Sequence, residues 1–191
     1  RPSSNDDGAP TTSLADLAPE YDAFGPRCFA LPKTGWPMLR YNPQPPQAAW
    51  RVCLRSAWQD LVVSGAAYVV DALGADGVYL DGTADPYACR NLSHGCGTLR
   101  KDGSIGPTFP IFSVRSTMRR IHEAVTSRKP EGQVDVHNST CMTTPTIGFA
   151  TTTWDGEQFA GIESGTPADR FLSLDVFRTE FMGRQWGVAA E

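Results

Sequence analysis

The chain has 191 residues, a net charge of −4 at pH 7 and a sequence pI near 5.4, with 40% hydrophobic and 20% charged residues. This composition is that of an ordinary globular protein with one substantial core. No cluster of Lys and Arg indicates a nucleic-acid partner, and no apolar run is long enough to span a bilayer.

Residues 1–50 are rich in Pro, Gly, Ser and Asp and follow no helical or strand period. We expect a loop-rich N-terminal segment there, followed by one catalytic domain over residues 51–191.

The first regular element is a helix that begins near Ser56. Ser56 and Gln59 form a capping-box pattern, and Gly74 is a typical glycine stop. A short apolar run, Val78 to Leu80, then predicts a strand buried on both faces, with Asp81 at its carboxyl end.

A long segment without helical period, residues 83–110, follows this strand. So long a loop inside a domain is usually functional. It contains Cys89 and Cys96, which could form a local disulfide. None of the five cysteines forms a CxxC pair, so we expect no structural zinc cluster and no resident metal or other cofactor.

Helices and strands alternate over the rest of the chain. We expect a helix from Pro110, strands over 133–137 and 146–154, a helix capped by Thr166 and Pro167, and a last strand from Trp186. This order predicts an α/β fold with parallel pairing, and we expect part of a (β/α)8 TIM barrel, because a whole barrel needs about 250 residues.

Three successive predicted strands end in polar residues, which is the strongest pattern in the sequence. Asp81 follows the first strand, Asp135 and His137 close the second, and Asp155 and Glu157 follow the third. The carboxyl ends of barrel strands carry catalytic residues, and paired carboxylates are the equipment of glycoside hydrolysis. We expect Asp81 as nucleophile and Glu157, with Asp155 as the second choice, as acid/base. The structural alternatives are a carboxylate that caps a turn at Asp81 and a turn-forming Asp-Gly at Asp155.

The remaining candidates are substrate-binding residues: His137, Asp135, Asn138, Trp154 and His94. Asp135 and His137 share a strand face, which leaves open a metal-dependent hydrolase with His94 or Asp81 as third ligand. A carbohydrate-binding protein without catalysis is a further alternative.

Several motifs occur together in one order. They are Gly-Ala-Asp-Gly-Val-Tyr-Leu-Asp-Gly-Thr, Cys-Arg-Asn-Leu-Ser-His-Gly-Cys-Gly, Pro-Ile-Phe-Ser-Val-Arg, Asp-Val-His-Asn-Ser, Asp-Gly-Glu-Gln-Phe and Gly-Arg-Gln-Trp-Gly. From about Trp50 to Glu191 the chain resembles the barrel region of bacterial proteins related to glycoside hydrolase family 123. The resemblance implies a (β/α)8 catalytic domain whose other strands and β-sandwich modules lie outside this chain.

The sequence departs from that family at one point. Family 123 enzymes use an adjacent Asp-Glu pair, whereas the nearest match here is Asp155-Gly-Glu157. Asp81 with an acid two strands later is similar to the α-galactosidase-like clan, so we expect double displacement on a carbohydrate. Two glycosylation-type sequons, at Asn91 and Asn138, indicate an extracellular or periplasmic location.

Overall fold

The computed structural model describes residues 52–137, 143–154, 166–182 and 187–190. It divides into two compact units, which we call unit 1 (residues 1–61 and 87–110) and unit 2 (residues 62–86 and 111–191). The predicted N-terminal loop segment, residues 1–50, lies outside the described residues.

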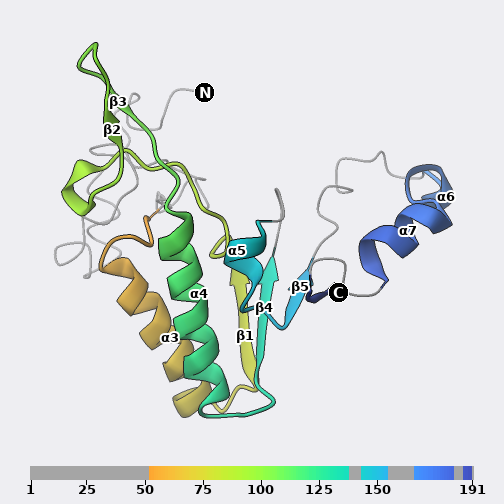
Figure 1. Ribbon diagram of the computed structural model, residues 1–191. Helices are drawn as coiled ribbons and strands as arrows, with labels where there is room; N and C mark the ends of the chain where they lie inside the picture. The colour runs from red at the N-terminus through yellow and green to blue at the C-terminus, as the bar shows by residue number, and fades with distance from the viewer. Residues whose placement is uncertain (1–51, 138–142, 155–165, 183–186, 191) are drawn as a thin grey trace, which may run out of the picture. The chain divides into compact units, whose positions relative to one another are not determined.

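Unit 2 contains a parallel sheet in the order β1-β4-β5-β6 (Figure 1). Its strands are β1 (Gly77–Asp81), β4 (Gln133–His137), β5 (Thr152–Trp154) and β6 (Ala189–Ala190). Each strand pairs in parallel with the one before it in this order, so the order does not reverse within the described sheet. The alternation of helices with parallel strands and the strand at 133–137 agree with the sequence prediction.

The two long helices are α3 (Trp58–Leu73) and α4 (Ile111–Thr126). Ser56 accepts a hydrogen bond from the Trp58 amide before α3, and Gly74 follows the helix at φ +71°. A left-handed residue at this position suits glycine, because other side chains are strained there. Both predicted helix boundaries are therefore close to the observed ones.

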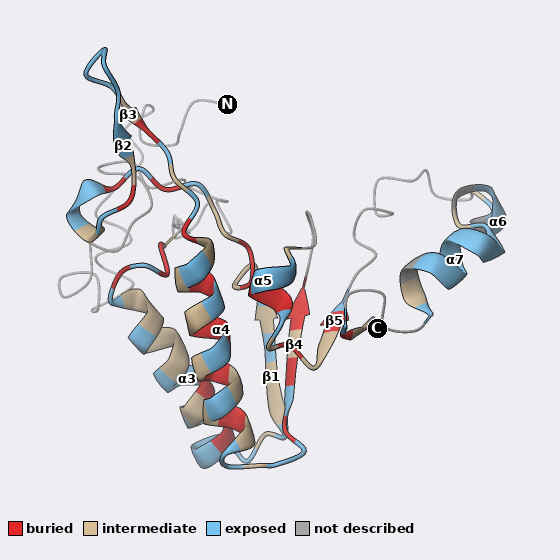
Figure 2. Ribbon diagram, viewed as in Figure 1, coloured by how far each residue is buried: buried red, intermediate tan, exposed pale blue. Residues whose placement is uncertain are grey.

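The core of unit 2 lies between α4 and one face of the sheet (Figure 2). Its fully buried side chains come from α4, β4, α5 (Thr144–Ile147) and β5: Val114, Thr117, Met118, Ile121, Val125, Val134, Val136, Thr146, Ile147 and Thr153. Four of them, Val114, Met118, Ile121 and Val125, recur at helical spacing along α4.

The opposite face of the sheet is polar and aromatic. Because side chains alternate along a strand and paired residues share a side, one set of residues lies together on this polar face. The set is Tyr79, Asp81, Asp135, His137, Thr152 and Trp154. Tyr79 is 52% exposed, so the prediction that its strand is buried on both faces was wrong. An aromatic ring in an apolar run does not by itself reveal which face is covered.

Two further boundaries differ from the prediction. The predicted strand from Thr146 begins only at Thr152, because Thr144–Ile147 form the short helix α5. Pro145 lies in the first turn of α5, and the Thr146 amide bonds the Thr143 carbonyl. The predicted last helix is two helices, α6 (Ala168–Phe171) and α7 (Leu174–Phe181). Ser173 separates them by accepting a bond from the Val176 amide, which makes it the N-cap of α7.

The described part of unit 1 contains little regular structure. It has a 3₁₀ turn, η1 (Leu92–His94), and a two-stranded antiparallel hairpin of β2 (Thr98–Leu99) and β3 (Ile105–Gly106). Cys89 and Thr108 exchange backbone hydrogen bonds of 2.8 Å. The prediction of a long segment without an α-helix is confirmed, and the hairpin within it was missed.

No helix among the described residues is long and apolar enough to cross a bilayer.

Candidate active site at the carboxyl ends of the parallel strands

Three neighbouring strands end at the same edge of the sheet in unit 2. Asp81 closes β1, His137 closes β4 and Trp154 closes β5, and the register pairs Asp81 with His137 and His137 with Trp154. Parallel pairing thus brings together three residues that the sequence analysis proposed for one site.

The carboxylate and the imidazole are close together but differently exposed. His137 Nδ1 lies 3.4 Å from Asp81 Oδ1, with the His137 side chain 8% exposed and that of Asp81 74% exposed. A buried imidazole fixed beside an exposed carboxylate restricts the orientation of that carboxylate and leaves its outer side open to solvent.

Aromatic rings surround His137. Its ring centroid lies 4.5 Å from that of Trp154, in an edge-on arrangement, and 6.1 Å from that of Tyr79. The rings of Tyr79 and Trp154 are 6.2 Å apart. Both aromatic side chains are substantially exposed, at 52% and 43%, so they offer an apolar surface beside the acid.

Asp135 lies one step back along the same face. Its Oδ1 accepts a 2.9 Å hydrogen bond from Thr152 Oγ1, which ties β4 to β5. Asp135, His137 and Asp81 do not form a group of closely spaced metal ligands, judged over the described residues. The metal-dependent alternative therefore receives no support from the described part of this edge.

Four proposed site residues do not belong to the described part of this edge. Asn138, Asp155 and Glu157 are outside the described residues, although Asn138 and Asp155 directly follow His137 and Trp154 in the sequence. His94 belongs to unit 1, where its Nε2 lies 3.1 Å from the Cys89 sulfur.

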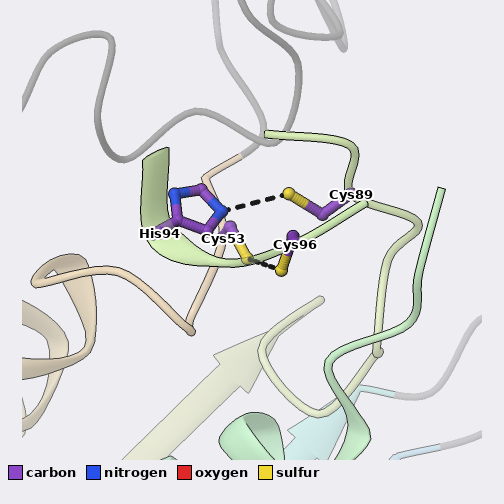
Figure 3. A group of neighbouring side chains, drawn as sticks. All are labelled: Cys53, Cys89, His94 and Cys96. Carbon is purple, nitrogen blue, oxygen red and sulfur yellow. Dashed lines mark hydrogen bonds between the residues drawn. The ribbon is translucent and has the colours of Figure 1, made fainter. Parts of the chain in front are cut away.

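A second cluster of chemically active side chains occurs in unit 1 (Figure 3). Cys53, Cys89, His94 and Cys96 bring their sulfur and nitrogen atoms within 4.8 Å of one another. All three cysteines are buried and none is bonded to another as a disulfide, so the possible disulfide between Cys89 and Cys96 is not formed. The sequence pattern did not reveal this cluster, because it contains no CxxC pair and Cys53 is far from the other three residues in sequence.

The three thiols influence one another's ionisation. Hydrogen bonds from Cys53 and His94 lower the pKa of Cys89 against the opposing effect of burial. The hydrogen bond with Cys89, together with burial, raises the pKa of Cys53, and burial and the charge on Cys89 raise the pKa of Cys96. Three buried thiolates repel each other when no cation is near, so ionisation concentrates on one sulfur.

Searches of protein-family models, curated proteins and solved structures found no match to this chain. The resemblance to proteins related to glycoside hydrolase family 123 therefore stays a prediction from the quoted motifs.

Proposed function

We propose that the chain is part of a glycoside hydrolase that cleaves glycosidic bonds in a polysaccharide or glycan. The observation that carries the proposal is the exposed Asp81 carboxylate at a strand end, held beside the buried imidazole of His137 and next to exposed aromatic rings. Barrel enzymes place their catalytic groups at the carboxyl ends of their parallel strands, which is where Asp81 lies.

In the proposed double displacement, Asp81 attacks the anomeric carbon and forms a covalent ester as the glycosidic C–O bond breaks. Glu157 gives its proton to the departing oxygen. Water then attacks the same carbon, Glu157 takes a proton from that water, and the Asp81 ester is released. His137 positions the Asp81 carboxylate, and Tyr79 and Trp154 contact the apolar face of a sugar ring.

The sheet order supports a barrel as the wider fold. The described strands of this sheet follow one another in chain order without reversal, as the strands of a barrel do. The further strands of a barrel would pair with the two edges of this sheet. The polar face of the sheet corresponds to a barrel interior in this proposal, with Asp81, His137 and Trp154 at its mouth.

The proposal is tested by trapping the covalent intermediate. The full chain is incubated with activated 2-fluoro glycosides of several sugars, digested, and analysed by mass spectrometry for a glycosyl adduct on Asp81. We expect the adduct with one sugar class, its loss in Asp81→Asn, and retention of turnover in Glu131→Gln. Glu131 is a suitable control because it lies in the turn before β4, at the opposite end of that strand.

Turnover that persists in both Asp81→Asn and Glu157→Gln would contradict the proposal. Binding of a glycan by a chain that cleaves none of the tested glycans would favour the carbohydrate-binding alternative, for which Tyr79 and Trp154 provide the surface.

A further inference from the structure

Four side chains converge in unit 1 from two parts of its sequence. Cys53 precedes α3, whereas Cys89, His94 and Cys96 lie in the loop before the hairpin (Figure 3). Three sulfurs and one imidazole nitrogen form the donor set of a structural zinc site, which is four-coordinate and closed to solvent. We propose that these residues bind a zinc ion as a tetrahedral Cys₃His site.

Two of the donor distances are close to those of a tetrahedron around zinc, and all four donor atoms lie within 4.8 Å of one another. Zinc–sulfur bonds of about 2.3 Å place two ligand sulfurs about 3.8 Å apart, and the sulfurs of Cys53 and Cys96 are 3.7 Å apart. A disulfide would need the two sulfurs to lie about 2.05 Å apart. The His94 Nε2 to Cys89 Sγ distance of 3.1 Å lengthens by a few tenths of an ångström when a cation enters between the two atoms.

Each ligand sulfur also has a hydrogen-bond donor from outside the four-residue set. The amides of Arg55 and Asn91 donate to Cys53 and Cys89, in each case from two residues further along the chain. The Thr108 hydroxyl donates to Cys96 and accepts from the Gly97 amide. Donors of this kind orient metal-bound thiolates and stabilise their charge, so the surroundings suit three ligated sulfurs.

The backbone around the last two ligands requires glycine. Gly95 and Gly97 have φ values of +78° and +88°, and these turns bring His94 and Cys96 to the same centre. A Cβ at Gly97 would lie 2.8 Å from the Ile105 side chain, so the turn also packs against the hairpin. The Arg55 guanidinium lies against Gly95, where its charge offsets the net negative charge of zinc with three thiolates.

Burial indicates a structural role for the ion. Cys53, Cys89 and Cys96 are 3%, 0% and 0% exposed and form the hydrophobic cluster of the described part of unit 1. The described part of unit 1 has only short regular elements besides the start of α3, and domains that bury little apolar surface are commonly stabilised by a metal. Four protein ligands leave no open position for substrate, so the site is independent of the proposed hydrolase activity.

The test measures metal directly on the full chain purified under reducing conditions. Elemental analysis is expected to find one zinc per chain, and replacement by Co²⁺ is expected to give the absorption of a tetrahedral, sulfur-rich site. Cys53→Ser, Cys89→Ser, His94→Gln and Cys96→Ser should each lose the metal. Cys28→Ser and Cys141→Ser serve as cysteine controls and His122→Gln as the histidine control, and all three should retain it.

Thr108→Val keeps all four ligands and removes the hydroxyl that donates to Cys96 and accepts from the Gly97 amide. We expect it to bind zinc about 10- to 100-fold more weakly in competition with a chelating indicator. A reduced, folded chain that takes up neither zinc nor Co²⁺ would overturn the proposal. So would a disulfide between Cys53 and Cys96 in the purified chain, or loss of the metal in the controls rather than in the ligand variants.

Discussion

His137 Nδ1 lies 3.4 Å from Asp81 Oδ1, and the two residues are direct partners in the parallel pairing of β4 with β1. The pairing fixes the distance between their Cα atoms, and burial fixes the imidazole. The orientation of the exposed carboxylate therefore depends on a group that does not itself need to contact substrate.

Replacing His137 is expected to reduce turnover without abolishing it. A contact to a charged group contributes about 1.5–3 kcal/mol, so His137→Gln should lower kcat by about 10- to 100-fold while KM changes less. The measurement is steady-state kinetics on the sugar class identified by trapping, with thermal unfolding to check the fold. A fall in kcat that is accompanied by a large fall in the unfolding temperature would instead indicate a purely structural role.

Removing the exposed indole is expected to weaken glycan binding. Trp154 is 43% exposed and contacts the His137 ring, so Trp154→Ala should raise the dissociation constant for a bound oligosaccharide at least several-fold, measured by calorimetry. Phe112→Ala is the matched control, because Phe112 is 83% exposed on α4 and lies in a different element. Equal weakening in both variants would contradict a specific role for Trp154.

The pairing of β1 with β4 depends on a glycine. A Cβ at Gly77 would lie 2.2 Å from the Gln133 carbonyl oxygen, so Gly77→Ala must displace one strand and should cost about 1–3 kcal/mol of unfolding free energy. Gly65→Ala in α3 adds a Cβ where nothing lies within 4 Å and should stabilise by about 0.5–1 kcal/mol. Denaturant unfolding of both variants checks the opposite signs.

An ion pair joins the turn before β1 to the turn before β4. Lys129 bonds the Asp76 carboxylate and the Gly74 carbonyl, and this hydrogen bond lowers the pKa of Asp76 below its usual value. A lowered carboxyl pKa stabilises the fold above the unfolded-state value and ceases to do so as the pH falls through the folded-state value. A double-mutant cycle with Asp76→Asn and Lys129→Met should therefore show coupling at pH 7 that disappears near pH 2. Coupling that is unchanged by pH would contradict this assignment.

Local sequence signals predicted the elements that they determine directly. Ser56 and Gly74 mark the ends of α3, and the alternation in Gln133 to His137 marks β4. The last helix was harder to predict, because no break in the apolar pattern at Ser173 reveals that this residue caps a new helix. Similarly, β-branched Thr146 and Ile147 favour a strand by propensity, but the turn that begins at Thr143 places them in α5.

The two candidate sites differ in how far sequence could locate them. Asp81, His137 and Trp154 end neighbouring strands of the sheet, so parallel pairing alone predicts that they meet at one edge. The cysteine cluster depends on a contact between Cys53 and a loop distant in sequence, which no local spacing encodes. The nearest available signal was the Cys89, His94 and Cys96 group with glycines at 95 and 97, which is three proposed ligands and two left-handed turns within nine residues.

Chelation is expected to unfold unit 1 before unit 2. The buried hydrophobic cluster in the described part of unit 1 consists of the proposed ligand sulfurs, whereas unit 2 has its own core around α4 and β4. Removing zinc with a strong chelator under reducing conditions should accelerate amide exchange over residues 87–110, including the Cys89–Thr108 hydrogen bonds, while β4 stays protected. Hydrogen exchange with mass spectrometry resolves these segments, and added Zn²⁺ should restore protection when added Mg²⁺ does not. Unchanged exchange over 87–110 in a chain shown to have lost its zinc would mean that the ion does not stabilise this unit.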